Sequence, residues 1–199
     1  AANIAEVAQR RGIDTEVMFL GEQTGRDVAS RHGSADLVVA NNVFAHVPDI
    51  VDFSKGLREL VADSGRVSIE IPHLLRLIEG NEYDTIYHEH YSYLTLLTAQ
   101  RVLAAADLQV IDIEELPTHG GSMRIWSAPT AAAVEASPSV ARVLADEAPL
   151  GVVERTGLVQ DRVGDGDLAD VVQLGGADHD VEVLGIEPRS LPIVWDADF

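Results

Sequence analysis

Cysteine is absent from this 199-residue chain, so disulfide bonds and thiolate metal sites are excluded. No apolar run approaches the roughly 20 residues that cross a bilayer, so we expect no membrane span. The opening residues, AANIAEVAQRR, lack the basic and then apolar layout of a secretory signal. Together these absences predict a soluble, cytoplasmic protein.

Basic residues are scarce as well. Lysine and arginine total 14 against 33 aspartates and glutamates, which gives a formal net charge of −19. Nucleic-acid phosphates need basic side chains to neutralise them, so this balance argues against a nucleic-acid partner. A small molecule that carries a nucleotide needs only local donors and stays compatible with the composition.

The first 72 residues alternate between two kinds of apolar pattern. Helical spacing occurs at 3–11, 24–32 and 50–61, and short apolar runs typical of strands occur at 15–20, 36–42 and 66–71. This alternation, with short connections, predicts an α/β fold with a parallel, doubly wound sheet. Ligands of such sheets bind at the carboxyl ends of the strands, and residues 41–46 lie at one such end.

The rest of the chain contains further predicted elements. They are a helix at 99–106, two antiparallel strands at 109–116 and 122–128, an alanine-rich helix at 131–148, and a strand–turn–strand pattern at 181–199. Residues 73–93 show little regular pattern. We predict a first domain over residues 1–130 and part of a second α/β domain over residues 131–199.

The segment YHEHYSY, residues 87–93, is unusually dense in chemically active side chains. A neutral imidazole beside a carboxylate, as at His90 and Glu89, can act as a general base. Tyrosine hydroxyls can stabilise the negative charge that develops on an enolate. These residue types suit proton abstraction next to a ketone. An ordinary polar loop is the alternative, and the density of the segment disfavours it.

A metal site is a second interpretation of the same segment. His88 and His90 would face one side of a strand, where two imidazoles could bind zinc. The segment does not match the HExxH helix motif, however, and no third ligand stands nearby. We therefore predict that the segment holds no metal.

Two other motifs have residues suited to ligands. HGGSMR, residues 119–124, combines glycines that permit close backbone approach with an arginine suited to a diphosphate. A tight turn followed by a structural arginine explains it equally well. NNVFAHV, residues 41–47, places two asparagines and a histidine where they could bind the amino-acid tail of a cofactor, or simply cap a strand end.

Taken in order, DLVVANNVFAHVPD, YDTIYHEHYSY and HGGSMRIW resemble the sugar C-methyltransferase family. Its members make branched deoxysugars for antibiotics from thymidine-diphosphate keto-hexoses. The resemblance is strongest to enzymes that methylate carbon 3 of a 4-keto-2,6-dideoxy sugar. It covers about residues 1–130, and LGIEPRSLPIVWD resembles part of the C-terminal domain of the family. The implied fold is a Rossmann-like class I methyltransferase domain, mostly parallel, with a terminal antiparallel hairpin.

The resemblance also implies a cofactor, S-adenosylmethionine, and a role for individual residues. The implied catalytic residues are the base His90 with Tyr87, Glu89 and His46 around it. The implied cofactor-binding residues are Gly21, Glu22, Asn41 and Asn42. The implied binding residues for the nucleotide sugar are Tyr83, His88, His119, Ser122 and Arg124.

Two features of the family are missing from this sequence. Its members begin with a cysteine-rich zinc-binding region and carry a glycine-rich cofactor loop, and neither occurs here. Zinc is thus expected in a full-length member and not in this chain, which we expect to be partial. The missing loop favours one alternative function, a non-catalytic sugar-nucleotide or cofactor-binding module. A metal-dependent hydrolase that uses His88 and His90 is the other.

Overall fold

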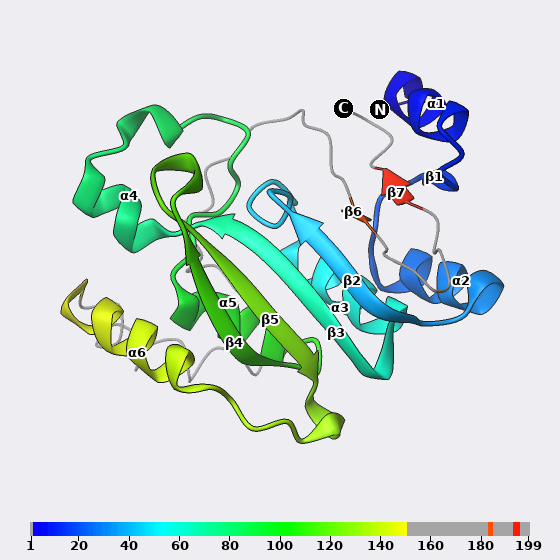
Figure 1. Ribbon diagram of the computed structural model, residues 1–199. Helices are drawn as coiled ribbons and strands as arrows, with labels where there is room; N and C mark the ends of the chain where they lie inside the picture. The colour runs from blue at the N-terminus through cyan, green and yellow to red at the C-terminus, as the bar shows by residue number, and fades with distance from the viewer. Residues whose placement is uncertain (1, 151–182, 185–192, 196–199) are drawn as a thin grey trace.

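The alternation of helices and strands folds into a five-stranded mixed sheet with helices packed against it and a separate two-stranded pair (Figure 1). The computed structural model describes residues 2–150, 183–184 and 193–195. The helices are α1 (Ala2–Arg10), α2 (Glu22–His32), α3 (Ile50–Leu60), α4 (Leu74–Gly80), α5 (Leu96–Ala104) and α6 (Pro138–Glu147). The strands are β1 (Thr15–Val17), β2 (Ala35–Asn41), β3 (Val61–Pro72), β4 (Leu108–Leu116), β5 (Ser122–Pro129), β6 (Val183–Leu184) and β7 (Ile193–Trp195). Short 3₁₀ turns are η1 (Tyr83–Thr85), η2 (Thr118–Gly120), η3 (Thr130–Ala132) and η4 (Ala148–Leu150).

Most predicted elements are confirmed close to their predicted bounds, and four differ. Strand β1 ends at Val17, whereas the prediction extended to residue 20. Helix α4 is absent from the prediction, which left residues 73–93 without regular structure. Strand β3 begins at Val61 instead of residue 66, because Val61 pairs with Ala35 of β2 across an irregular register. Helix α6 covers only part of the predicted 131–148. Of the predicted pattern at 181–199, β6 and β7 are strands and the other residues lie outside the described ranges.

The five-stranded sheet has the order β4-β5-β3-β2-β6. Strands β2 and β3 are parallel, with Val38 opposite Val67. Strand β5 lies antiparallel between β3 and β4, as a hairpin requires, because its short turn cannot carry a parallel crossover. The α/β class and the terminal antiparallel hairpin are confirmed. Among the described strands, the parallel pairs are β2–β3 and the separate β1–β7 pair.

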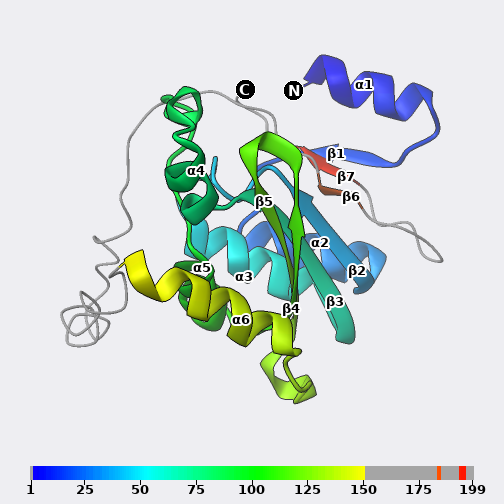
Figure 2. The same cartoon turned by 60° about the vertical axis from the view of Figure 1, so that its left-hand side comes forward.

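The core lies between the sheet and the helices on one of its faces. Figure 2 shows α3, α5 and α6 on the same side of the strands. Val67, Ile69 and Ile71 alternate along β3 and are buried there. Val140 and Val143 of α6 belong to the same buried cluster. Helix α6 follows the predicted boundary at residue 130 and nevertheless packs on the first domain. The division into two domains stays a prediction, because most of residues 151–199 lie outside the described ranges.

Helices α2 and α3 approach each other through glycines. A Cβ atom on Gly25 would lie 2.6 Å from the carbonyl oxygen of Gly56. A Cβ atom on Gly56 would lie 2.7 Å from the carbonyl oxygen of Gly21. Side chains at these positions would push the helices apart. None of the helices in the described part of the chain is long and apolar enough to cross a membrane.

Candidate active site

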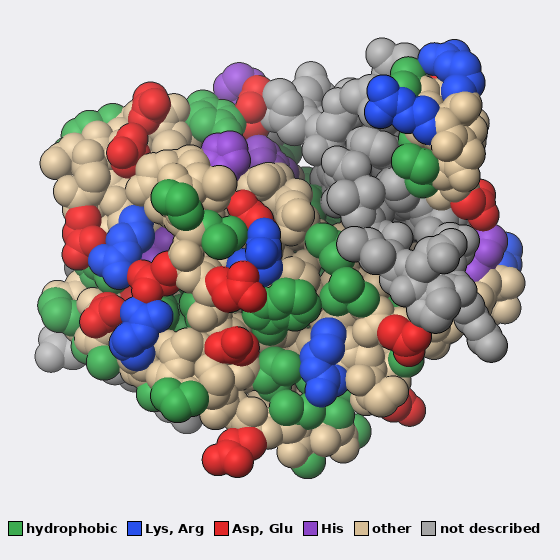
Figure 3. Space-filling view, in the orientation of Figure 1, with side chains coloured by type: hydrophobic (Ala, Val, Ile, Leu, Met, Phe, Trp, Pro, Cys, Tyr) green, Lys and Arg blue, Asp and Glu red, His purple; other side chains and the backbone are tan. Residues whose placement is uncertain are grey.

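The carboxyl ends of β2 and β3 meet the loop formed by residues 83–93. The amide of Ser92 donates to the carbonyl oxygen of Ala45, at 3.1 Å, and so ties this loop to the segment after β2. His73, just after β3, forms an isolated bridge with Leu94 at the other end of the loop. In the space-filling view, histidine side chains gather above these strand ends (Figure 3). The two predicted motifs therefore form one site.

His90 lies at the centre of this site, with only 5% of its surface exposed. Its Nδ1 lies 3.0 Å from the carbonyl oxygen of Thr85. A carbonyl oxygen only accepts hydrogen bonds, so Nδ1 carries the proton when the ring is neutral. Nε2 is then the basic nitrogen, and it accepts a hydrogen bond from the hydroxyl of Tyr87 at 3.0 Å. The backbone thereby fixes which nitrogen can take a proton.

The surroundings keep this imidazole neutral. Burial lowers the pKa of His90, the hydrogen bond to Thr85 raises it, and the charge of His119 lowers it, with a net shift downward. Burial, assisted by the neighbouring Tyr93, raises the pKa of Tyr87. At neutral pH the pair is therefore a neutral base and a protonated phenol, which are the states that a base and a hydrogen-bond donor need.

Aromatic rings surround His90. The ring centroids of Tyr87 and His90 lie 4.2 Å apart, and those of His46 and His90 lie 4.7 Å apart. Tyr93 meets His90 edge-on at 5.6 Å. His46 donates from Nδ1 to the backbone carbonyl oxygen of Glu89, at 2.9 Å, so its Nε2 is the unprotonated nitrogen of the neutral ring. The structure thus brings together the four predicted catalytic residues, although Glu89 contacts His46 through its backbone.

Two asparagines mark the end of β2, a few residues before His46. Asn42 has a positive φ of 55°, and its amide donates to the carbonyl oxygen of Glu70 at 2.8 Å. The side-chain oxygen of Asn41 is buried and has no hydrogen-bond partner among the described residues. A buried acceptor without a partner is costly. Asn41 is therefore suited to a donor group from a bound molecule.

The other two predicted cofactor residues, Gly21 and Glu22, take part in helix packing. Glu22 forms ion pairs with Arg26 at 2.9 Å and with Lys55 at 3.5 Å. Its pKa is lowered, first by the hydrogen bond from Arg26. A Cβ atom on Gly21 would collide with the carboxylate of Asp52. Their role at a cofactor stays a prediction.

The turn between β4 and β5 contains His119, Gly120 and Gly121, all with positive φ. A Cβ atom on Gly121 would lie 2.6 Å from Cβ of Arg76, so this glycine lets the turn pack against α4. The hydroxyl of Ser122 donates to the carbonyl oxygen of Thr118 within the same turn, at 3.0 Å. Only His119 is linked to the central cluster, through its effect on the pKa of His90. Ligand contacts of His119 and Ser122 stay predictions.

Arg124 is held on the sheet by two carboxylates. It pairs with Glu70 at 2.9 Å and with Glu114 at 3.2 Å. A diphosphate would have to compete with both for the guanidinium group. Its predicted contact with the nucleotide sugar stays a prediction.

His88 and His90 lie in different environments. The side chain of His88 is 69% exposed and lies 3.8 Å from Glu89, whereas His90 is buried. Among the residues that the structure describes, no group of three or more His, Cys, Asp or Glu side chains could hold a metal ion. The geometry therefore offers no support for the hydrolase interpretation.

Two features of the site were not singled out from the sequence. One is the carbonyl oxygen of Thr85, which accepts from His90 and, at 3.2 Å, from the hydroxyl of Tyr93. The other is Tyr93 itself, the last tyrosine of YHEHYSY. A backbone carbonyl leaves no signal in a sequence, while the tyrosine density could have indicated Tyr93.

A family model for a methyltransferase domain matches residues 4–113, more than half of the chain. The chain belongs to this methyltransferase domain family. The matched range contains both β2 with its asparagines and the loop with His90. A curated relative, C-methyltransferase NovU of Streptomyces niveus, is 39% identical over 152 residues. The alignment covers 76% of this methyltransferase chain and 36% of NovU, so the chain spans about a third of its relative.

Solved methyltransferases resemble the domain only in part. A SAM-dependent methyltransferase from Anabaena variabilis is 14% identical, with a TM-score of 0.42 and 55% of each chain covered. The 16S rRNA (adenine(1408)-N(1))-methyltransferase W203A mutant from Catenulisporales acidiphilia is 22% identical, with a TM-score of 0.34 and coverage of 55% and 54%. These scores are too low to add to the family assignment.

Proposed function

We propose that this chain is the catalytic part of an S-adenosylmethionine-dependent C-methyltransferase that acts next to a ketone. The observation that carries the proposal is the Tyr87–His90 pair, in which a buried imidazole presents Nε2 to a phenol 3.0 Å away. Carbon methylation next to a carbonyl needs a base for the carbon-bound proton and a donor for the carbonyl oxygen. The pair supplies both.

Substrate binding would exchange one hydrogen bond for two new contacts. The hydroxyl of Tyr87 now donates to Nε2 of His90. When a ketone enters, this hydroxyl turns to its oxygen and leaves Nε2 open to the neighbouring C–H bond. His90 takes the proton, and the electron pair of that bond forms an enolate whose oxygen Tyr87 stabilises. The carbonyl oxygen of Thr85 supports the imidazolium through Nδ1.

The residues at the end of β2 fit the cofactor. The unpartnered side-chain oxygen of Asn41 suits the ammonium group of a methionine tail. Asn42 follows it with a positive φ of 55° and is exposed. S-adenosylmethionine, when bound, supplies the methyl group that the activated carbon receives. Positioning by the protein would then contribute much of the rate.

For the substrate, we propose a thymidine-diphosphate 4-keto-deoxysugar methylated at carbon 3. The similarity to NovU, named a C-methyltransferase, and the order of the three sequence motifs support this class. The alternative is a module that binds a sugar nucleotide or cofactor without catalysis. The two differ in whether a carbon–carbon bond is made.

The test incubates the full chain with labelled S-adenosylmethionine and a thymidine-diphosphate 4-keto sugar, followed by mass analysis. We expect the sugar to gain one methyl group. His90→Asn should abolish the gain and leave cofactor affinity nearly unchanged, because His90 contacts Tyr87 and Thr85 and not Asn41. His32→Asn, a histidine on α2 that pairs with Glu16, is the matched control and should keep full activity.

Three outcomes would change the proposal. Binding of both ligands without methyl transfer leaves the non-catalytic module. Loss in His119→Asn with none in His90→Asn assigns the base to the β4–β5 turn. Loss of turnover with a chelator, restored by a divalent ion, favours a metal-dependent enzyme.

A further inference from the structure

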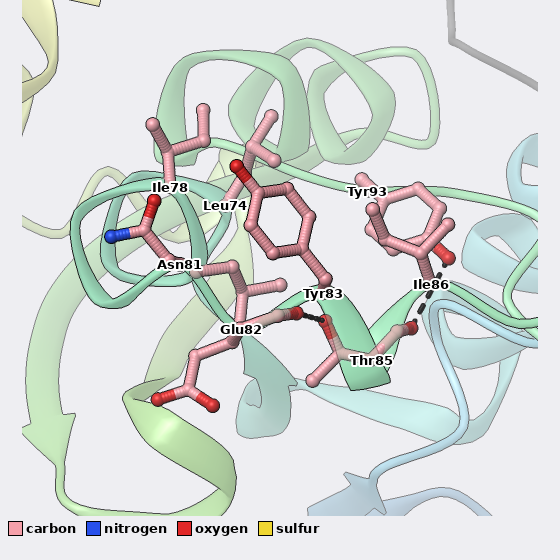
Figure 4. A pocket seen from close by; sticks show the side chains of 9 residues that line it. Leu74, Ile78, Asn81, Glu82, Tyr83, Thr85, Ile86 and Tyr93 are labelled. Atoms are coloured by element: carbon pink, nitrogen blue, oxygen red, sulfur yellow. Dashed lines mark hydrogen bonds between the residues drawn. The ribbon is translucent and has the colours of Figure 1, made fainter.

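A cavity of about 380 Å³ is lined by residues of α4 and η1 and by Tyr93 (Figure 4). Its walls are mainly apolar and include Leu74, Ile78 and Ile86. Tyr83 stands at its mouth with 73% of its surface exposed, and Ile78 and Ile86 are more than half exposed. This volume falls within the range of small-molecule pockets. Exposed apolar side chains around a hollow mark a binding surface.

The cavity adjoins the catalytic cluster without opening onto its base. Tyr93 lines the cavity and also meets the ring of His90 edge-on. Thr85 lines it too, and its carbonyl oxygen holds both His90 and Tyr93. His90 itself does not line the cavity, so a substrate group inside it does not contact Nε2 of His90. That group cannot be the reacting carbon, but it can belong to the same molecule.

The charged residues in the cavity lining limit which part of the substrate can bind there. The lining contains no lysine, arginine or histidine, and its one ionisable carboxyl belongs to Glu82. A diphosphate would meet no cation there. A ribose would place its hydroxyl groups against isoleucine and leucine side chains. Of the parts of a sugar nucleotide, only the nucleobase combines neutrality, apolar faces and distance from the reacting carbon.

The polar groups at the mouth match a nucleobase edge. Asn81 is fixed in a left-handed conformation at the end of α4, with φ of 54°. Asn81 and Tyr83 both line the cavity (Figure 4), and neither side chain has a hydrogen bond to another described residue. A carboxamide offers both a donor and an acceptor, as the imide edge of a pyrimidine requires. Tyr83 offers a ring on which the base can stack.

We propose that this cavity is the nucleobase subsite for the sugar nucleotide, with Tyr83 as the stacking platform and Asn81 as the edge-reading residue. The inference rests on the proposed function for its substrate, but it concerns binding and not the chemical step. The exposed residues of α4 and η1 take no part in the catalytic cluster, and this subsite would give them a role in binding.

The experiment measures the affinity of the full chain for thymidine, a neutral nucleoside. Stacking on an aromatic residue corresponds to a loss of about 5- to 150-fold in affinity when the ring is removed. We expect Tyr83→Ala to weaken thymidine binding within this range and Tyr83→Phe to retain most of it. Ile78→Trp should fill the cavity and also weaken binding. Ile13→Ala removes an equally apolar exposed side chain outside the cavity and is the matched control.

Equal thymidine affinity in the parent and Tyr83→Ala would overturn the proposal, as would a parent that does not bind thymidine. Self-association of the parent that Tyr83→Ala abolishes, without thymidine binding, would make this face an interface between copies and also overturn it. The methyl-transfer assay separates this inference from the proposed function. If the parent transfers methyl groups but Tyr83→Ala leaves thymidine affinity unchanged, only the subsite is refuted. If thymidine binding depends on the ring of Tyr83 but no methyl group is transferred, only the proposed methyltransferase activity is refuted.

Discussion

Glu147, at the end of α6, joins three parts of the structure that the sequence separates widely. It is 2% exposed, and its carboxylate lies 2.7 Å from Nε2 of the buried His73, just after β3. It also accepts from the amides of Leu96 and Leu97, in the first turn of α5. The carboxylate of α6 thus adds to the N-terminal cap of α5, where the hydroxyl of Thr95 already accepts from the amide of Thr98. We predict that Glu147→Ala strongly destabilises the domain that contains the candidate active site.

The magnitude follows from what the substitution leaves behind. Removing the carboxylate leaves the ring of His73 and two helix-terminal amides buried without their acceptor. Breaking a buried polar pair in this way costs about 3–5 kcal/mol. With a urea dependence of about 2 kcal/mol per molar for a domain of this size, the unfolding midpoint should fall by roughly 2 M. Glu147→Gln retains one acceptor oxygen, so its urea midpoint should lie between those of the parent and Glu147→Ala.

The assay is urea unfolding followed by far-ultraviolet circular dichroism. Asp146→Ala is the matched control, because Asp146 pairs with Arg142 at 3.7 Å on the surface, where an ion pair contributes at most about 1 kcal/mol. A loss below about 1 kcal/mol for Glu147→Ala would refute the reasoning. It would mean that α6 folds as part of a separate unit and does not support β3 and α5.

Two further predictions concern pH and helix packing. Because burial lowers the pKa of His90 in the folded chain, the unfolded chain binds this proton more readily. The free energy of unfolding should therefore fall as the pH drops below about 6.5, the ordinary histidine pKa. The urea midpoint of His90→Asn should decline less steeply over the same pH range. Equal declines in the parent and the variant would contradict this prediction. Gly56→Ala should lower the free energy of unfolding by about 1–3 kcal/mol through overpacking, since its Cβ would lie 2.7 Å from a backbone oxygen. If Gly56→Ala had the same urea midpoint as the parent, α2 and α3 would be able to move apart without a loss of stability. Ala105→Ser, at the end of α5, is the control.

Much of the fold was predictable because its signals are local. Apolar spacing defined α3 before the structure showed Asp49 capping it, with its carboxylate 2.9 Å from the amide of Asp52. Helix α4 was missed because it has only seven residues, so the helical spacing of Leu74, Leu77 and Ile78 spans barely two turns. Asp63, Ser64 and Gly65 interrupt the apolar pattern near the start of β3, and only pairing with β2 makes Val61 a strand residue. Such pairing is a tertiary effect.

The candidate site was partly predictable for the same reason. The residue types of His90 and Tyr87 suggested a base and a donor, and the structure places them in contact. The contact of His46 with His90 could be expected only because His46 follows the carboxyl end of a strand. Glu147 was overlooked because an acidic residue in an alanine-rich helix suggests an exposed position. Its spacing from Val140 and Val143, on one helical face, was the available signal.

The carbonyl oxygen of Thr85 decides which nitrogen of His90 is basic, and it belongs to the main chain. Side-chain replacements at residue 85 leave that oxygen in place, so the residue type there can vary during evolution while the protonation pattern of the imidazole is inherited with the path of the backbone. Alanine scanning would therefore overlook this atom. Converting the amide between residues 85 and 86 to an ester weakens the carbonyl as an acceptor, and it would expose a contribution that ordinary mutagenesis does not reach.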